Sequence, residues 1–455
     1  MSSSIIIIGA GASGLLAARH LSAAGWSVTL LEAAPLPGGR ILTLSSPFTA
    51  PAEGGAEFIH GDLPISLQLA AEAGIPLHPV HGNMTRVQGE EGVQGEEDVP
   101  ATKKDEEDQE DEENPEDEED HRGGGMSPYW GQLMKKMGEI KEDLPIADFL
   151  TTWFSEEKYA SLRDTVQRFA EGYDLADLHT VSTLALYKEW ANEGDEEEYR
   201  LEGGYGRLID WLAGECRRNG CTLHLSTPAT LVCWQQGRVE VTTRDGQQFN
   251  ADRLVTTVSL GVLQQSAGIS PAIQFSPAIP EYMHAANQIG YGSVIKILME
   301  FKTAFWKEKE GAGQTLFVIS DQPIPTWWTQ TDTTPPLLTG WLAGKARVSF
   351  QALDDQGRID RCLRTLAAIF SADPDLLRQQ LTAFRALDWE QAPYVRGGYS
   401  FDTVHTPAAR TLLLTPIAQT LYFAGEALYE GSAPGTVEAA FSSGLSVAEK
   451  IIAQP

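Results

Sequence analysis

The chain begins with an apolar run that is followed by a glycine-rich turn. Residues 5–8 are four consecutive isoleucines, and an uninterrupted branched run of this kind is typical of a strand buried on both faces of a parallel sheet. The spacing of apolar residues then predicts a helix over 13–24 and a second strand over 26–31. This order of strand, helix and strand predicts an α/β fold with a parallel sheet.

The same periodicities continue through the chain. Helical spacing of apolar residues predicts further helices within 65–73, 127–195, 207–218 and 358–370. Alternation predicts strands over 76–80, 222–225, 230–234, 239–243, 254–258 and 291–301. In the last of these strands, Lys296 falls on one face between Val294 and Leu298. A lysine in that position needs water, a carboxylate or a cofactor, although a lysine protecting an edge strand is also consistent with the pattern.

The turn after the first strand has the spacing G-x-G-x-x-G. Its first glycine permits the tight turn, the second lets the backbone approach a pyrophosphate, and the third lets the helix pack closely on the strand. The phosphates would lie at the helix N-terminus. The candidate cofactor-binding residues of this turn are Gly9, Gly11, Ala12, Ser13 and Gly14.

A second glycine turn distinguishes between possible dinucleotides. Glu32, at the end of the second strand, is placed to bind a ribose 2′-hydroxyl, and an acid there disfavours a 2′-phosphate. The run 35–40 then adds Gly39 and the cation Arg40, which can reach the same pyrophosphate from the other side. A nicotinamide dehydrogenase has no need of this second turn, so the sequence favours FAD.

These glycine turns, together with the segment 53–61, resemble the flavin-dependent amine oxidase family, and the Phe-Ile-His-Gly run within that segment most resembles polyamine oxidases. Further similarity lies at 291–301, 389–401 and from 423 onwards. The resemblance implies an α/β fold in which a Rossmann-like FAD-binding domain carries an inserted α+β substrate-binding domain. The implied segments are 1–61, 203–282 and 395–455 for the first domain, and 62–202 and 283–394 for the second.

The resemblance also implies how FAD is held. Backbone atoms of Ala229 would contact the adenine, Glu426 the ribityl chain, and the Val437 N–H the flavin pyrimidine. Monoamine oxidases bond their flavin covalently through a cysteine, and Gly398 stands at that position, so noncovalent FAD is expected. The other cofactor-binding residues implied are Gly55, Ala56, Glu57, Phe58, Trp389, Gly425 and Thr436.

Three catalytic residues follow from the same resemblance. Lys296 would hold a water against flavin N5, Tyr399 would form one wall of an aromatic cage, and His60 would face the substrate. The implied reaction is hydride transfer from an amine α-carbon to N5, followed by imine hydrolysis and release of H2O2 with O2 as acceptor. No nucleophile or metal is required, because the cofactor carries the difficult chemistry.

The second wall of the cage is not evident, since 432–436 offers no aromatic residue and Tyr429 is a possible substitute. Trp327 and Trp328 are candidates for an aromatic pocket wall. Glu171 is either a partner for a substrate ammonium or an ordinary carboxylate on a helix surface.

A polyamine or a primary amine is the expected substrate. An L-amino-acid oxidase would need an arginine for the substrate carboxylate, and Leu42 stands where that family supplies one. A non-catalytic flavoprotein that uses an acidic loop to bind a basic partner is a further alternative, and the functional lysine expected at Lys296 argues against it.

Charge is concentrated in one stretch. The formal net charge is −29, and residues 90–120 hold 18 acids and two lysines, or −16, which leaves −13 for the rest. Few residues of 89–125 could be buried, so this segment is predicted to be a disordered loop, either a spacer or an electrostatic funnel for cationic amines. Nucleic acid is an improbable partner for so acidic a chain.

The four cysteines have no C-x-x-C spacing, which predicts neither a metal site nor a disulfide scaffold and fits a reducing cytoplasm. No apolar run approaches membrane-spanning length. A soluble cytoplasmic enzyme with a small amine and O2 as its partners is therefore expected.

Overall fold

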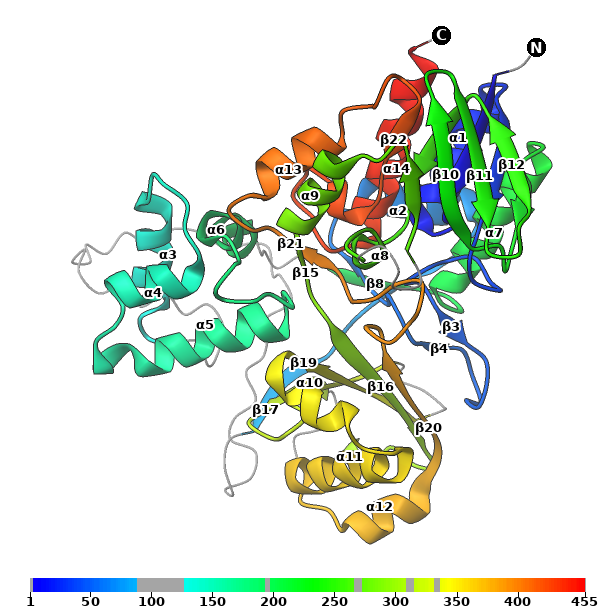
Figure 1. The fold of residues 1–455 in the computed structure, drawn as a ribbon. Coiled ribbons are helices and arrows are strands. Elements are labelled where there is room, and N and C mark those ends of the chain that lie inside the picture. The colour runs from blue at the N-terminus through cyan, green and yellow to red at the C-terminus, as the bar shows by residue number, and fades with distance from the viewer. Residues whose placement is uncertain are drawn as a thin grey trace, which may run out of the picture.

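A computed structural model describes residues 3–87, 127–192, 197–265, 272–307, 315–330 and 336–454 (Figure 1). The acidic segment 89–125 lies outside the described residues, so its disorder stays a prediction. The two ends of the chain lie close together in Figure 1, where the blue and red helices α1 and α14 run side by side. Within the described ranges, no helix has both the length and the apolar character that crossing a bilayer requires.

The first sheet is a five-stranded parallel sheet, and it contains the strands predicted at 5–8 and 26–31. Its spatial order is β22 (Leu421–Phe423), β13 (Arg253–Thr256), β1 (Ser4–Ile8), β2 (Ser27–Leu31) and β9 (Thr222–His224). The isoleucine run is buried on both faces, as expected for a central strand. Ile5 and Ile7 pack under helices, and Ile6 and Ile8 point into a second cluster.

Helices and a smaller sheet cover the two faces. One face carries α1 (Ala12–Ala23), α2 (Pro64–Ala73), α7 (Tyr205–Arg218) and α14 (Val437–Ile452). The other carries α9 (Pro280–Gln288), α13 (Thr406–Leu413) and a sheet ordered β12 (Gln248–Ala251), β11 (Arg238–Thr243), β10 (Ala229–Gln235) and β14 (Gln274–Ser276). The domain limits remain a proposal, and α2 packs on α14 although it follows the proposed boundary at residue 61.

A six-stranded sheet forms the lower part of the molecule in Figure 1. Its order is β20 (Leu381–Asp388), β16 (Val294–Phe301), β19 (Leu337–Ala343), β18 (Thr326–Thr329), β17 (Thr315–Ser320) and β7 (Asn83–Val87). One face of this sheet, with Ile295 and Ile297, packs against α11 (Asp355–Phe370). Helices α10 (Gly344–Gln351) and α12 (Pro374–Gln380) lie beside α11. Because β16 lies between two strands, the interpretation of Lys296 as an edge-strand lysine is wrong.

A helical module lies to one side and has its own core. It consists of α3 (Trp130–Glu139), α4 (Ile146–Trp153), α5 (Ala160–Gly172) and α6 (Thr183–Asn192). Small sheets link the regions: β3 (Thr43–Leu44) with β4 (Ala52–Glu53), β15 (Gly290–Tyr291) with β21 (Ser400–Phe401), and β5 (Ile59–His60) with β8 (Glu198–Leu201) and β6 (Leu77–Pro79). The short helix α8 (Leu260–Leu263) follows β13.

Candidate active site

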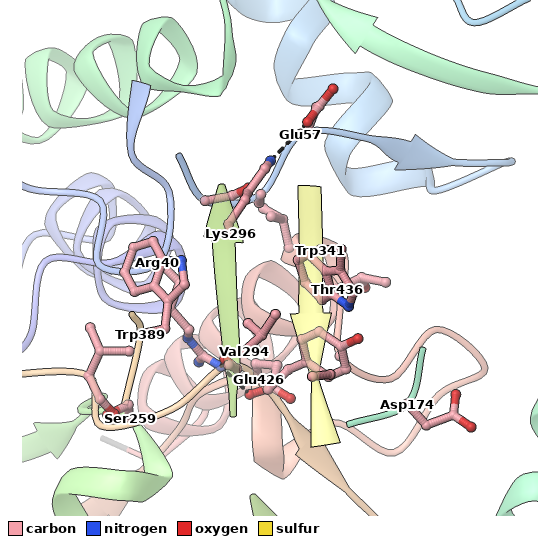
Figure 2. A pocket seen from close by; sticks show the side chains of 18 of the residues that line it. Arg40, Glu57, Asp174, Ser259, Val294, Lys296, Trp341, Trp389, Glu426 and Thr436 are labelled. Carbon is pink, nitrogen blue, oxygen red and sulfur yellow. Dashed lines mark hydrogen bonds and ion pairs between the residues drawn. The ribbon is translucent and has the colours of Figure 1, made fainter. Parts of the chain in front are cut away.

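A cavity of about 2790 Å³ runs from the first sheet to the six-stranded sheet and the helical module. Ligand pockets typically measure about 300–1,000 Å³, so this cavity has room for a dinucleotide together with a substrate. All but one of the residues predicted as catalytic or cofactor-binding line it, and Figure 2 shows several of them from close by. The exception is Gly14, where an added Cβ would lie 2.0 Å from the Gly9 carbonyl oxygen. Gly14 therefore permits close packing of α1 on β1.

The N-terminus of α1 opens on the cavity. Gly11, Ala12 and Ser13 line it, and no side chain caps the first turn of the helix. A Cβ added at Gly11 would be in ordinary van der Waals contact with the Gly38 carbonyl oxygen, at 3.8 Å, so the turn is not crowded there. Ser13 Oγ is buried and has no hydrogen-bond partner among the described residues. A helix N-terminus without a side-chain cap, an uncrowded turn and an orphaned hydroxyl fit a pyrophosphate at this helix end.

Glu32 lies at the carboxyl end of β2, beside that turn. Its Oε2 accepts a hydrogen bond from the Ala10 N–H at 2.7 Å, and its Oε1 accepts one from the Ala34 N–H at 2.8 Å. Burial raises the pKa of Glu32, and these backbone N–H groups oppose the rise. Because each oxygen keeps a further lone pair, the carboxylate can also accept ribose hydroxyls. Gly38 N–H bonds the Ala10 carbonyl at 2.9 Å and brings the second glycine turn, with Gly39, against the first.

A second helix N-terminus, that of α14, faces the same cavity through Thr436 and Val437. Nearby, Arg40 Nη1 donates to Glu426 Oε2 and to the Gly398 carbonyl, each at 2.8 Å. Arg40 and Glu426 were predicted to contact different parts of FAD, and the structure joins them directly in an ion pair (Figure 2). Ala229, Trp389, Gly425, Gly55 and Ala56 complete this part of the lining.

Lys296 is almost fully buried, with 1% of its surface exposed, and still reaches the cavity lining. Its Nζ donates to the Gly55 carbonyl at 2.9 Å and to Glu57 Oε2 at 2.8 Å (Figure 2). Glu57 also accepts Arg200 Nε at 3.0 Å and Trp328 Nε1 at 3.0 Å. Burial raises the pKa of the Glu57 carboxyl, but the Lys296 and Arg200 cations outweigh it and hold that pKa below its usual range.

Sequence reasoning predicted Glu57 as a cofactor-binding residue and did not identify Arg200. The Glu57 carboxylate is turned toward the two cations and the residue lines the cavity, so its cofactor-binding role stays a prediction. The only sequence signal was that a buried lysine needs a partner such as a carboxylate. That signal did not indicate which residue is the partner of Lys296.

Aromatic rings form one wall of the cavity. This aromatic wall consists of Phe58, Phe317, Trp328, Trp341 and Tyr399, with successive ring centroids 5.9–6.4 Å apart. Trp328 was a predicted wall residue, whereas the prediction for Trp327 is wrong. Neighbouring strand residues point to opposite faces, so Trp327 is fully buried under α11 and bonds the Ile324 carbonyl at 3.1 Å.

Tyr399 has an aromatic partner that the sequence did not indicate. The rings of Trp341 and Tyr399 are within 21° of parallel. Tyr429, the predicted substitute for the missing cage residue, does not line the cavity, and its ring lies where a Cβ on Gly431 would point. Trp341 pairs with Lys296 between β19 and β16, and this register would have identified it, but register is not readable from sequence alone.

The remaining polar lining separates into two sides. His60 Nδ1 lies 2.8 Å from Glu198 Oε1 at the rim, close to the Phe58 ring. On the side of the helical module, Glu171 accepts from Gln167 Nε2 at 3.2 Å. Other acids on that side are Asp164, Asp174 and Glu189. The structure thus brings Lys296, Tyr399 and His60 to one cavity, although it assigns them no reaction.

Comparison with known proteins agrees with this arrangement. The family model described as flavin containing amine oxidoreductase matches residues 12–452. Lysine-specific histone demethylase 2 of Homo sapiens is 28% identical over 99% of this chain, and the match covers 53% of that protein. Polyamine oxidase 4 of Oryza sativa subsp. japonica is 27% identical over 98% of the chain and is covered to 88%. The chain therefore spans about half the length of the demethylase.

Solved structures share the fold. Putrescine oxidase bound to putrescine superposes with a TM-score of 0.78 at 19% identity, with 100% of both chains covered. Cyclohexylamine oxidase from Brevibacterium oxydans IH-35A gives a TM-score of 0.77 at 20% identity, covering 100% of this chain and 99% of that one. At such identities the similarity establishes the fold alone.

Proposed function

The chain belongs to the family of flavin-containing amine oxidoreductases, and from that premise we propose that it oxidises amines without a carboxylate, using noncovalent FAD and O2. The observation that supports this proposal is the continuity of one cavity. Its dinucleotide end has two helix N-termini, and its other end has Lys296 and the aromatic wall. When bound, FAD supplies the acceptor for hydride from the amine α-carbon, and its reoxidation by O2 gives H2O2.

We propose that the chain's own residues bind and orient the amine. Tyr399 and Trp341 would present neighbouring aromatic surfaces to the amine, and such surfaces suit both an apolar carbon chain and a cation. Lys296 has three N–H donors and uses two of them on Gly55 and Glu57. The third is the donor that can hold a water in the cavity. His60 at the rim is suited to a second polar group of the substrate.

Polyamines and simple primary amines are the substrates that this proposal favours. The side of the cavity formed by the helical module carries carboxylates, including Glu171 and Asp174, which attract cationic amines. The relatives include polyamine oxidases, and a matching fold is that of putrescine oxidase.

A panel with peroxide detection tests the proposal. It contains spermine, spermidine, putrescine, aryl-ethylamines and the twenty L-amino acids. We expect peroxide from amines and little from amino acids. Greater turnover of arginine or lysine than of every amine without a carboxylate would contradict the amine proposal.

Oxidation of L-amino acids is the second candidate. Arg168 lines the cavity on α5, where it could bind a substrate carboxylate although Leu42 cannot. If this second candidate is right, replacement of Arg168 with glutamine should raise KM for amino acids. If the first proposal holds, the same replacement should leave KM for simple amines nearly unchanged.

A reducing compartment such as the cytoplasm is proposed as the place of action. All four cysteines, Cys216, Cys221, Cys233 and Cys362, are free thiols, which fits such a compartment.

A further inference from the structure

Glu57 lies where three separate parts of the chain meet. Its carboxylate accepts Lys296 Nζ from β16, Arg200 Nε from β8 and Trp328 Nε1 from β18. The side chains of Glu57 and Lys296 are each only 2% exposed, and that of Arg200 is 18% exposed. Both carboxylate oxygens are therefore occupied by donors in a site that holds little water. Such a carboxylate fixes the positions of its partners rather than binding a solvated ligand.

The charges around Lys296 give Glu57 a second effect. Lys296 and Arg200 are cations and Glu57 is an anion, so the three groups together carry about one positive charge. Glu53 on β4 is a second carboxylate that interacts with Lys296, and burial raises the pKa of Glu53 to about 7. Without Glu57, the Lys296 ammonium and the Arg200 guanidinium would lose their shared anion, and Glu53, whose pKa the Glu57 charge helps to raise, would be left beside Lys296. Removal of one member of a buried ion pair leaves an uncompensated charge, which is strongly unfavourable.

We propose that Glu57 is a positioning residue for Lys296, holding its ammonium against the Gly55 carbonyl so that the remaining N–H donor faces the cavity. This inference rests on the proposed function, because it assigns Lys296 a part in amine oxidation. Glu57 does not touch the substrate, and its effect on the rate is exerted through Lys296. The Arg200 and Trp328 contacts keep the carboxylate in place when substrate enters.

A double-mutant cycle on the FAD-loaded enzyme tests the proposal. The variants are Glu57→Gln, which removes the charge at nearly constant shape, Lys296→Met, and the two combined. Flavin reduction by the best amine of the panel is followed by stopped flow under anaerobic conditions. Each single change should slow reduction at least tenfold, and the double variant should be within twofold of Lys296→Met, because Glu57 has nothing to position once the lysine is absent.

Thermal stability supplies a readout that does not depend on turnover. Glu57→Gln should lower Tm, because Lys296 and Arg200 lose their shared anion. Addition of Lys296→Met should raise the Tm of that variant again, because only the partly exposed Arg200 cation then remains without its anion. This recovery is specific to a charge linked to Lys296. A general packing defect at Glu57 would lower the Tm of both backgrounds equally.

Glu300→Gln is the matched control. Glu300 is buried like Glu57 and lies on β16 with Lys296, but its carboxylate bonds Thr49 and Thr382 outside the cavity. It should leave the reduction rate unchanged. Wild-type rates in Glu57→Gln, or effects that multiply in the double variant, would overturn the proposal. If Glu57→Gln does not fold, the proposal is overturned when flavin reduction in the double variant is more than twofold slower than in Lys296→Met. A wild-type enzyme that no amine reduces would refute the proposed function, while the Tm cycle would still decide the coupling.

Discussion

The ring centroids of Trp341 and Tyr399 lie 6.4 Å apart, and the two rings are within 21° of parallel. Trp341 Nε1 donates to the Gly172 carbonyl at 2.8 Å, and the Tyr399 hydroxyl donates to the Tyr173 carbonyl. Consecutive carbonyls at the end of α5 thus anchor both rings. The orientation of both rings in the cavity therefore depends on the helical module.

Replacement of Trp341 with alanine should lower kcat/KM for amines at least tenfold, which corresponds to about 1.4 kcal/mol of transition-state stabilisation. The physical reason is the loss of one aromatic face beside Tyr399, and Trp341→Phe should recover most of the loss. Steady-state kinetics with the flavin content of each preparation check this. Tyr429→Phe is the control and should behave as wild type, because Tyr429 does not line the cavity. Equal losses of kcat/KM in Trp341→Ala and Tyr429→Phe would show that Trp341 has no specific part in the active site.

Acid precipitation should release all the flavin into the supernatant. Gly398 has no sulfur with which to form a thioether, and Leu175 Cδ1 lies 2.5 Å from where its Cβ would be. Absorbance of the supernatant and fluorescence of the denatured protein on a gel measure the two fractions. Flavin that stays with the pellet would mean a covalent bond to another residue.

Much of the fold could be predicted because it depends on local patterns. Strand β1 follows from four isoleucines, and α1 from the apolar spacing that ends before Gly25. The alternation in β16 correctly placed Ile295 and Ile297 on the face opposite Lys296. These signals need only a few neighbouring residues and the periods of helices and strands.

The active-site partners could not be predicted in the same way. Glu57 is 239 positions from Lys296 and 143 from Arg200, and their contact depends on how β16, β8 and the loop between β4 and β5 meet. Trp341 faces Tyr399 only because of the register of β19 against β16. Family resemblance indicated which residues approach the cofactor, but it could not supply partners that are particular to this chain.

The pH dependence of stability should contain a contribution from Glu53. Burial raises its pKa to about 7 from an ordinary 4.5, against the opposing effect of Lys296 and the Tyr205 N–H. A raised folded-state pKa favours the protonated form, so this stability is present below about pH 4.5 and is lost as the pH rises through about 7. The full change is on the order of 3 kcal/mol.

Glu53→Gln should remove this titration. Its Tm relative to wild type should therefore rise between pH 5 and pH 8, because the wild type must bury a carboxylate charge at the higher pH and the variant does not. Scanning calorimetry of both proteins across that range measures the difference. A constant Tm difference would show that Glu53 does not titrate in this window.

Deletion of residues 89–125 should leave Tm and flavin content nearly unchanged, because a segment of this composition has few residues that could be buried. The described residues on either side of it are informative. Arg86 on β7 and Trp130 at the start of α3 both line the cavity, so the described chain on either side of the acidic segment lies at the cavity. This position favours the electrostatic funnel over the spacer.

If the acidic segment attracts amines, kcat/KM for spermine should be highest at low ionic strength and should fall as salt screens the attraction. The deletion variant, which lacks 18 acids, two lysines and one arginine, or a net charge of −15, should have a lower kcat/KM at low salt and a flatter salt dependence. A singly charged amine such as an aryl-ethylamine should be affected less, because steering scales with substrate charge. Measurement of both substrates between about 20 and 500 mM salt, a range over which the Debye length falls several-fold, decides between the two interpretations. Identical salt dependence in the full chain and the deletion would leave the segment as a spacer and assign attraction of the amine to the carboxylates of the helical module.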